Sequence, residues 1–434
     1  ALLLSASGSV APRLDGIGAA LALVHSLAGV APPSPLLLLT RGAQVAAPLC
    51  AAAPACGAAN GGAWGFGRVV RLEHAGLCGQ SIDAPACASA AAMGGALASA
   101  AAGPTAAEAE VAWGAASSRH AARLRVCAAA TALEGRLEVA RGSYAITGGL
   151  GGLGLRAAAL FVGAGGAEVV LASRSGRVAR DGQRLEAMLL ALVGRAAVRT
   201  AAADVADSLD ACGLLSGVDS ELRGLLHAAG VLRDRLLRNL ASGDLHAVFA
   251  PKALAASHVV RVARRAPLEA LLLFSSIAAA FGGVGQAGYS AASAYLDGLA
   301  LGQSMGGSLS TSLQIPPVDG AGMSAGAVAD GQLDAACCVA LDAFGAWLLH
   351  CLAPPTERTQ MLLHPELLEA ASSAREAGGR DLRFSELAAA ATDCAARGRP
   401  ATTASAQPRV GGAFAHALAP LSPWRRSEHV EAAV

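Results

Sequence analysis

The chain has 434 residues, more than the roughly 250–300 at which a single hydrophobic core stops growing, so we expect more than one structural unit. Its 33 Lys and Arg residues nearly balance 32 Asp and Glu residues, and the net charge of +1 excludes a broad electrostatic surface for nucleic acid or an anionic membrane. Recognition of phosphate must therefore be local.

The ten cysteines include no Cys-x-x-Cys pair, and no Cys/His cluster has the spacing of a zinc site. We expect buried thiols in a reducing cytoplasm and no metal, with disulfides or metal ligands as the alternative. The chain starts Ala-Leu-Leu-Leu, without an initiator Met or the basic lead-in of a signal peptide. This start is typical of a piece excised from a longer protein.

Two residue types are unusually rare in this sequence. Lys252 is the only lysine, and Tyr144, Tyr289 and Tyr295 are the only tyrosines. A chain that favours Ala, Gly and Arg this strongly is expected to keep a Lys or Tyr mainly where a substitute would fail. These four residues are therefore the first candidates for a functional role.

The front portion, residues 1–140, has a strand signal at Pro35–Thr40 and a second one at Gly67–Leu72. Its glycines around Gly61–Gly67 do not complete a Gly-x-Gly-x-x-Gly turn between a strand and a helix. We predict an α/β unit that binds no nucleotide.

From about residue 143, strands alternate with glycine turns and helices, which is the pattern of a parallel sheet covered on both faces. We therefore predict a doubly wound, Rossmann-like sheet with right-handed crossovers over residues 141–366. The expected strands are Tyr144–Thr147, Glu168–Ala172, Gly224–His227, Ala270–Phe274 and Thr311–Ile315, and the expected helices include Leu153–Val162, Tyr289–Leu301 and Leu333–Leu352.

Residues 367–434 form the third predicted part of the chain. From Ser372 onward the sequence mixes Ala, Arg, Gly, Thr and Pro with little apolar periodicity, so we predict a linker. A different stretch, Ala270–Leu296, carries no charge and is long enough to span a bilayer. Its serines and its Phe-Gly-Gly-Val-Gly run favour strand, loop and helix in a buried sheet, so no membrane span is expected.

The segment Tyr144-Ala-Ile-Thr-Gly-Gly-Leu-Gly-Gly-Leu-Gly154 places Gly149, Gly151 and Gly154 in the Gly-x-Gly-x-x-Gly spacing, after a strand and before a helix. Glycine allows the tight turn and the close approach of a pyrophosphate to the helix N-terminus, so this motif predicts a dinucleotide site. The alternative is a glycine-rich turn without a ligand, in a chain that contains 52 glycines.

The end of the next strand indicates which nucleotide is bound. An NAD site usually presents an acidic residue about 20 positions after the glycines. Here that position is Arg174, between Ser173 and Ser175, and a guanidinium with two hydroxyls suits the 2′-phosphate of NADPH. The alternative for Arg174 is a solvated charge. Asp204 in Ala-Asp-Val is a candidate contact to the adenine edge.

Ser276 and Tyr289 are the candidate catalytic pair. A carbonyl that accepts hydride develops negative charge on oxygen, and so needs a hydrogen-bond donor and a proton source on one side of the nicotinamide. A phenol is a sluggish acid near neutrality unless a neighbouring ammonium stabilises the phenolate. The chain's one ammonium is Lys252, in Val-Phe-Ala-Pro-Lys-Ala on the preceding helix; the alternative is a solvated surface lysine.

The order of these motifs resembles the ketoreductase domains of polyketide synthases and of animal-type fatty acid synthases. The resemblance covers roughly residues 1–366. Its further motifs are His227-Ala-Ala-Gly-Val-Leu-Arg-Asp, Ser275-Ser-Ile-Ala, Gly285-Gln-Ala-Gly-Tyr-Ser-Ala-Ala-Ser-Ala-Tyr-Leu-Asp and, in the front portion, Thr40-Arg-Gly-Ala and Trp64-Gly-Phe-Gly-Arg-Val-Val-Arg-Leu-Glu-His.

The resemblance implies a short-chain dehydrogenase type of fold, preceded by a degenerate Rossmann-like structural subdomain without cofactor. In an ordinary short-chain dehydrogenase the lysine follows the tyrosine as Tyr-x-x-x-Lys, but position 293 is serine and the family's swapped lysine falls on Lys252. The implied cofactor-binding residues are Thr147, Gly148, Gly149, Leu150, Gly151, Gly152, Leu153, Gly154, Ser173, Arg174, Ser175, Asp204, Val205, His227, Ala228, Ala229 and Gly230.

The implied reaction is reduction of a β-ketoacyl thioester on an acyl carrier protein, among neighbouring synthase domains, with substrate entering near Met323. Ser293 stands where the family usually has asparagine, although its hydroxyl could still pass a proton through water. Asp234, and Phe281 in place of tryptophan, favour the group that forms the D-configured hydroxyl. The alternatives are a catalytically silent scaffold domain, the equivalent step of fatty acid synthesis, and a membrane-associated Ala/Gly-rich protein.

Overall fold

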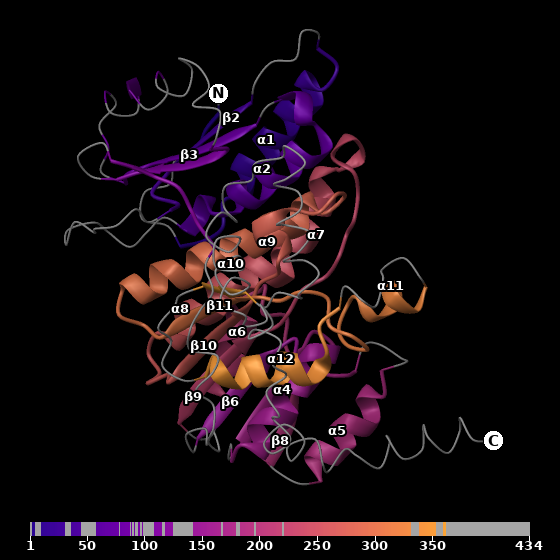
Figure 1. The fold of residues 1–434 in the computed structure, drawn as a ribbon. Helices are drawn as coiled ribbons and strands as arrows, with labels where there is room; N and C mark the ends of the chain where they lie inside the picture. The colour runs from indigo at the N-terminus through magenta and orange to yellow at the C-terminus, as the bar shows by residue number, and fades with distance from the viewer. Residues whose placement is uncertain are drawn as a thin grey trace, which may run out of the picture.

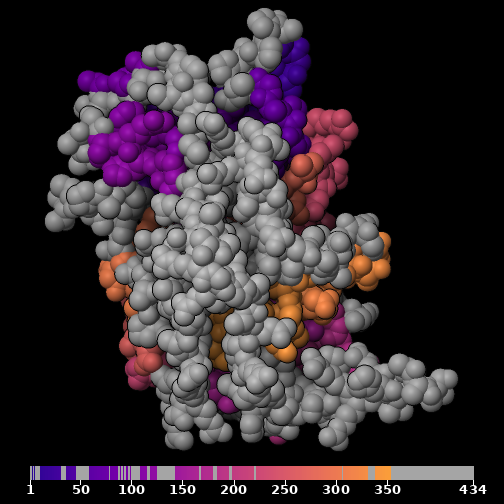
Figure 2. All heavy atoms as spheres, in the orientation of Figure 1, coloured from indigo at the N-terminus to yellow at the C-terminus, as the bar shows by residue number. Residues whose placement is uncertain are grey.

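The chain folds around two separate β-sheets (Figure 1). The computed structural model describes residues 2–4, 10–30, 36–44, 58–77, 79–86, 88, 91, 94, 95, 98, 108–114, 118–124, 142–165, 168–178, 183–194, 197–218, 221–330, 338–352 and 359–361. The space-filling view places the indigo and violet atoms of the first sheet's unit toward one end and the orange atoms of the later segments in the other half (Figure 2).

The first sheet has five strands in sequence order, four of them parallel and the last antiparallel. These strands are β1 (Leu2–Leu4), β2 (Leu37–Arg41), β3 (Gln80–Ala84), β4 (Glu110–Trp113) and β5 (Arg119–His120). Its crossovers include the helices α1 (Leu14–Leu27) and α2 (Gly62–Glu73), with the short 3₁₀ turns η1 (Ala58–Asn60) and η2 (Ala75–Leu77). The strand predicted at Pro35–Thr40 corresponds to β2.

The strand predicted at Gly67–Leu72 is wrong, because these residues belong to α2. The adjacent valines Val69 and Val70 favour a strand when they are read alone. However, β2 and β3 are parallel neighbours, and parallel neighbours need a crossover that is usually helical. Tertiary packing therefore overrides the local preference of this segment.

The second sheet has seven parallel strands in the order β12-β11-β10-β9-β6-β7-β8, which is the doubly wound order with a switch between β6 and β9. The strands are β6 (Ser143–Thr147), β7 (Glu168–Ser173), β8 (Ala197–Ala202), β9 (Leu222–His227), β10 (Ala270–Phe274), β11 (Ser310–Gln314) and β12 (Thr359–Met361). The predicted Rossmann-like fold is confirmed.

The helices between these strands cover both faces of the sheet. They are α4 (Gly152–Gly163), α5 (Leu185–Val193), α6 (Ser208–Ser216), α7 (Ser242–Phe249), η6 (Ala250–Leu254), α8 (Ala255–Ala263), α9 (Ala278–Phe281), α10 (Ala287–Met305), α11 (Ala325–Ala329) and α12 (Leu341–His350), with the 3₁₀ turn η5 (Leu237–Asn239). The helix predicted over Leu333–Leu352 is confirmed over Leu341–His350, and Val339 instead pairs with Val318 in an isolated bridge. Residues 333–337 of that prediction lie outside the described residues.

Side chains of the central strands alternate between two cores. Ala145, Leu225 and Leu273 face one core, whereas their neighbours Ile146 and Leu226 face the other. This period of two follows from strand geometry, and apolar side chains on both faces are typical of a parallel sheet that helices cover on each side.

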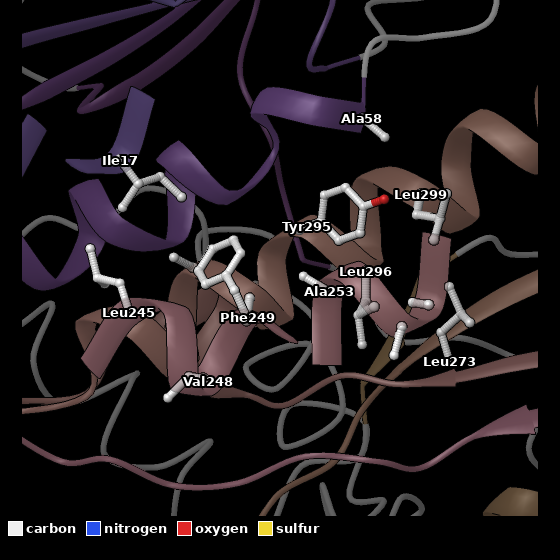
Figure 3. Close-up of a cluster of buried hydrophobic side chains, with 14 of the residues drawn as sticks. Ile17, Ala58, Leu245, Val248, Phe249, Ala253, Leu273, Tyr295, Leu296 and Leu299 are labelled. Atoms are coloured by element: carbon white, nitrogen blue, oxygen red, sulfur yellow. The ribbon is translucent and has the colours of Figure 1, made fainter. Parts of the chain in front are cut away.

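The first core continues into the unit of the first sheet, so the two sheets share one hydrophobic cluster (Figure 3). In the close-up, Ile17 and Ala58 approach from the first unit toward Phe249 and Tyr295 of the second. The Tyr295 ring is fully buried, and its hydroxyl donates a hydrogen bond to the carbonyl of Val10 at 2.5 Å. The interface between the two units is therefore part of a buried hydrophobic core.

Among the described elements, helices α2 and α10 form the most extensive contact between the two units, and Figure 1 shows α10 running below α2. A Cβ on Gly65 would lie 2.2 Å from the carbonyl oxygen of Ser290, and one on Gly62 would lie 2.9 Å from that of Ala291. Glycine at these two positions lets the helix backbones touch. The predicted boundaries at residues 140 and 366 stay predictions, and the linker predicted at 367–434 lies outside the described residues.

Over the ranges that the structure describes, no helix has the length and apolar character needed to cross a membrane.

Candidate active site

A cavity of about 1050 Å³ opens at the carboxyl ends of the strands of the second sheet. Its wall comes from the loops that follow β6, β7, β8, β9, β10 and β11, together with η6 and the first turn of α10. This is the edge at which doubly wound sheets bind their ligands. Three of the four predicted catalytic residues line this cavity, namely Lys252, Ser276 and Tyr289.

Lys252 is 2% exposed, so its ammonium is held by the protein and not by solvent. The Nζ atom donates a hydrogen bond to the carbonyl of Phe274 at 3.1 Å and lies 4.4 Å from the centroid of the Tyr289 ring. The interpretation of Lys252 as a solvated surface lysine is therefore wrong. The ammonium and the phenol come together although 36 residues separate them along the chain.

Lys252 owes its position to a local break in the helix. The five residues Ala250–Leu254 form a π-helical turn between α7 and α8, and Pro251 at its start has no N–H to donate. Such wide turns leave carbonyl groups free for other partners. The carbonyl of Lys252 accepts a hydrogen bond from His227 Nε2 at 2.8 Å.

That bond fixes the tautomer of His227. Because Nε2 donates to a carbonyl, Nδ1 carries no proton in the neutral ring and accepts from the hydroxyl of Thr147 at 2.7 Å. Burial lowers the pKa of His227 to about 4, so the ring is neutral near pH 7. Thr147 and His227, both predicted to contact cofactor, lie outside the cavity lining and hold the backbone of Lys252 from behind.

Ser276 follows β10 and lines the cavity, where its Oγ accepts a hydrogen bond from the Ala278 amide at 3.2 Å. The neighbouring Ser275 donates to the carbonyl of Ser293 at 3.0 Å and so ties this loop to α10. Ser293 itself is fully buried and does not line the cavity. Within the described part of the chain its hydroxyl has no hydrogen-bond partner, and of the four predicted catalytic residues Ser293 alone does not reach the cavity wall.

The predicted glycine turn follows β6 and leads directly into α4. Gly148 has φ +67, and a Cβ there would lie 2.6 Å from the amide nitrogen of Ala229. At Gly154 a Cβ would lie 2.4 Å from the carbonyl oxygen of Gly148. Both positions need glycine, which leaves a cradle at the helix N-terminus into which a pyrophosphate could come close.

Most of the predicted cofactor residues line this cavity. The lining residues from that prediction are Gly148, Leu150, Gly151, Gly152, Leu153, Gly154, Ser173, Arg174, Ser175, Asp204, Val205, Ala228, Ala229 and Gly230. Gly149 is absent from the lining, as are Thr147 and His227; a Cβ on Gly149 would instead lie 2.6 Å from the carbonyl oxygen of Ile146.

Arg174 lies exposed at the end of β7. Within the described ranges its guanidinium has no hydrogen-bond or ion-pair partner, so it is available for an anion. The hydroxyls of Ser173 and Ser175 both donate to the carbonyl of Arg177 at 3.3 Å, which folds the loop into a turn and brings Arg177 to the same cavity wall. Asp204 is exposed at the end of β8, where its carboxylate accepts from the Ala206 amide at 3.1 Å.

The cavity lining also contains residues that sequence reasoning named only in passing or missed. Asp234, Phe281 and Met323 are among them, as is Gln286, which was not predicted. The amide of Gln286 donates to the Asp234 carboxylate at 3.0 Å and links the loop after β9 to the start of α10. Only the closeness of Gln286 to Tyr289 in the sequence could have drawn attention to it.

The described residues contain no group of three or more His, Cys, Asp or Glu side chains able to hold a metal ion.

Comparison with known proteins gives the family. Residues 142–320 match the family model described as the KR domain. Polyketide synthase GfsA of Streptomyces halstedii is 34% identical over 320 residues, 72% of this chain and 4% of that protein. The mycocerosic acid synthase-like polyketide synthase of Mycobacterium tuberculosis is 39% identical over 160 residues, 36% of this chain and 7% of that protein. This chain thus spans a small fraction of the relatives it matches.

Solved structures give the same result. An A1-type ketoreductase is 29% identical with a TM-score of 0.72, over 84% of this chain and 77% of that chain. The first ketoreductase of the tylosin PKS is 27% identical with a TM-score of 0.72, over 88% of this chain and 82% of that chain.

One further relative by sequence is a phenolphthiocerol synthesis polyketide synthase of Mycobacterium tuberculosis that is named as inactive. It is 40% identical over 174 residues, 39% of this chain and 10% of that protein.

The doubly wound sheet, the glycine turn and the Lys–Tyr–Ser cavity define an oxidoreductase of the short-chain dehydrogenase/reductase type, a class that binds a nicotinamide cofactor. Within that class the chain belongs to the ketoreductase domains of polyketide synthases.

Proposed function

We propose that this chain reduces a β-ketoacyl thioester, carried by an acyl carrier protein, to the β-hydroxyacyl thioester with NADPH as reductant. The observation that carries the proposal is the position of the Lys252 ammonium, 4.4 Å from the Tyr289 ring centroid, in the cavity that the glycine turn also lines. NADPH, when bound, would supply the hydride that adds to the β-carbon of the substrate.

The residues present fit this cofactor. The cradle at Gly148 and Gly154 leaves backbone exposed at the N-terminus of α4, where the helix dipole favours phosphate. Arg174 and Arg177 stand on the wall at the end of β7, with no acidic side chain in the loop that joins them. Two guanidinium groups suit a 2′-phosphate, and this supports NADPH over NADH.

Tyr289 would donate its hydroxyl proton to the carbonyl oxygen as that oxygen gains negative charge. Lys252 would stabilise the phenolate left behind, because a buried ammonium interacts more strongly with a nearby anion than a solvated one does. Ser276 would donate the second hydrogen bond to the same oxygen. Ser293 has no equivalent task in this arrangement, and proton resupply would have to reach the cavity by another route.

The second candidate is a catalytically silent scaffold domain within a multienzyme. Two observations favour it: the buried Ser293 does not line the cavity, and one relative is named as inactive. The intact Lys252–Tyr289 pair favours catalysis. In either case the proposed partners are an acyl carrier protein and neighbouring synthase domains, in the cytoplasm.

The test is the substitution Tyr289→Phe, which removes the proton donor and keeps the ring over which Lys252 lies. We expect the wild type to oxidise NADPH when a short β-ketoacyl thioester is supplied, and the variant to lose this turnover by about 100-fold or more. Binding of NADPH, followed by its fluorescence, should persist in the variant.

Tyr144→Phe is the matched control, because Tyr144 stacks on Phe161 in the core at 4.8 Å between ring centroids and lies outside the cavity lining. Turnover should survive this change. Full turnover by the Tyr289→Phe protein would refute the assignment, and NADPH binding without turnover by the wild type would favour the scaffold.

A further inference from the structure

Glu73, the last residue of α2 in the first unit, reaches across to two loops of the second unit. Its Oε1 accepts a hydrogen bond from the Gly285 amide at 2.8 Å, and its Oε2 accepts one from the Leu237 amide at 2.6 Å. One carboxylate therefore binds two backbone segments that lie far apart in the sequence.

Neither the stability of helix α2 nor an ion pair explains why an acidic residue stands at position 73. A negative charge at the C-terminal end of a helix opposes the helix dipole, so α2 alone would be more stable with a neutral or basic residue there. Within the described ranges the carboxylate forms no salt bridge, and both of its oxygens are used on amide donors. Charged acceptors of this kind make the stronger backbone hydrogen bonds.

The Gly285 bond holds the segment that connects Ser276 to Tyr289. Gly282, Gly283 and Gly285 fall within four residues, and two of them have φ near +80, at +77 and +80. Such a segment has many conformations open to it and needs external contacts to keep one. The same helix supplies further contacts, since Arg68 donates to the carbonyl of Ala279.

The Leu237 bond holds the segment that carries Asp234 along the other side of the cavity. Leu237 is held at both ends of its backbone, because His25 of α1 donates to its carbonyl at 2.7 Å. The two loops also bond directly to each other, from the Arg235 amide to the Gly285 carbonyl at 2.7 Å. Glu73 closes this set of contacts from outside, without lining the cavity itself.

We propose that Glu73 is a positioning residue for ketoreduction: by binding the Gly285 and Leu237 amides together, it sets how the acyl thioester lies between Asp234 and Tyr289. The inference rests on the proposed function for its substrate. It gives the first unit a direct part in the geometry of the active site.

The experiment compares the wild type with Glu73→Gln, in which an NH₂ group replaces one acceptor and faces an amide donor. With a 2-methyl-3-ketoacyl thioester we expect kcat/KM to fall about 10- to 100-fold, mainly through KM, because small displacements of positioning groups have effects of that size. The product should contain both hydroxyl configurations where the wild type makes one. NADPH affinity should stay within about twofold, since the glycine turn and β7 loop are untouched.

Glu108→Gln is the matched control. Glu108 pairs with Arg123 inside the first unit, so this variant carries the same Glu→Gln change at a carboxylate that holds neither cavity loop. It should keep the wild-type KM and product configuration. Hydrogen exchange supplies a readout independent of turnover: peptides containing Gly285 and Leu237 should exchange faster in Glu73→Gln and not in Glu108→Gln.

A folded Glu73→Gln protein with unchanged KM, configuration and exchange would overturn the proposal, as would the same changes in the control. If Glu73→Gln does not fold, Glu73→Asp decides the question, because it keeps the charge but is too short to reach both amides. Should the wild type reduce no thioester, the proposed function fails. The exchange experiment would still show whether Glu73 holds the Gly285 and Leu237 segments together.

Discussion

In the described residues, the two sheets turn at the carboxyl end of a strand in similar ways, but the amides of the two turns have different partners. After β2, Gly42 has φ +70, and after β6, Gly148 has φ +67. In the first unit the buried carboxylate of Asp83 accepts hydrogen bonds from the Ala43 and Gln44 amides at 2.9 and 3.0 Å. In the second unit the turn opens onto the cavity.

In the first unit, the Asp83 carboxylate thus binds the amides of the turn. In the second unit, the corresponding turn faces the cavity and could bind an anion from a ligand. Thr40 strengthens the arrangement, since its hydroxyl donates to Asp83 at 2.6 Å and accepts from the Trp64 indole at 3.0 Å. A strand, a turn and a helix do not by themselves make a nucleotide site. What decides is whether the protein's own side chains already occupy the amides of the turn.

The largest expected effect comes from removing the ammonium of Lys252, a group present in the second unit and absent from the sequence of the first. Lys252→Met should lower turnover with a β-ketoacyl thioester by about 100- to 1,000-fold, because the phenolate of Tyr289 loses its neighbouring cation. The temperature of unfolding should not fall, since an apolar side chain of similar length avoids burying a charge. A variant that turns over at the wild-type rate would show that Lys252 takes no part in the chemistry.

The next effect compares the two turns through Gly148→Ala and Gly42→Ala. Both glycines have positive φ, so each substitution should strain the backbone by about 1–3 kcal/mol. Only Gly148→Ala should weaken NADPH binding, by about 10- to 100-fold, because its Cβ would press on the Ala229 amide at 2.6 Å and distort the cradle. Fluorescence titration measures the affinity, and equal affinities in the two variants would remove the distinction between the turns.

The last prediction concerns stability and not activity: the two units should respond to pH in opposite directions. Burial raises the pKa of Asp83 from 3.8 to about 6, so its contribution to stability is lost as pH rises through 6. Burial lowers the pKa of His227 from 6.5 to about 4, so its contribution is lost as pH falls from 6.5 toward 4. Each shift corresponds to about 3 kcal/mol.

Thermal unfolding between pH 4 and 8 should separate the two groups. Relative to the wild type, Asp83→Asn should become more stable as pH rises from 4 to 6, and His227→Gln should become more stable as pH falls across the same range. Parallel curves for the wild type and a variant would mean that the substituted group does not titrate in that window.

Much of the second unit could be predicted from sequence, because its signals are local. The strands Ala270–Phe274 and Tyr144–Thr147 follow from buried apolar runs, and the turn at Gly149–Gly154 follows from the spacing of its glycines. Lys252 was identifiable because composition made it unique. Strand β8 (Ala197–Ala202) carries no clear run of apolar residues and was missed.

The rest depends on contacts between distant segments. The family resemblance implied that His227 contacts cofactor, but its ring faces Thr147 and the Lys252 carbonyl. Glu73 closes a helix that was read as a strand, so nothing local pointed to its two amide partners. Ser293 was assigned by position within a motif, and position does not tell which way a hydroxyl faces.

The shared core around Tyr295 has a practical consequence for synthase engineering. The Tyr295 ring packs against both units, and its hydroxyl donates a hydrogen bond to the carbonyl of Val10. A graft that transfers only the second unit would therefore expose the hydrophobic surface of α10 that the first unit covers. Chimaeric assembly lines built from this protein should therefore splice outside the span from β1 to β12 and transplant it as one block.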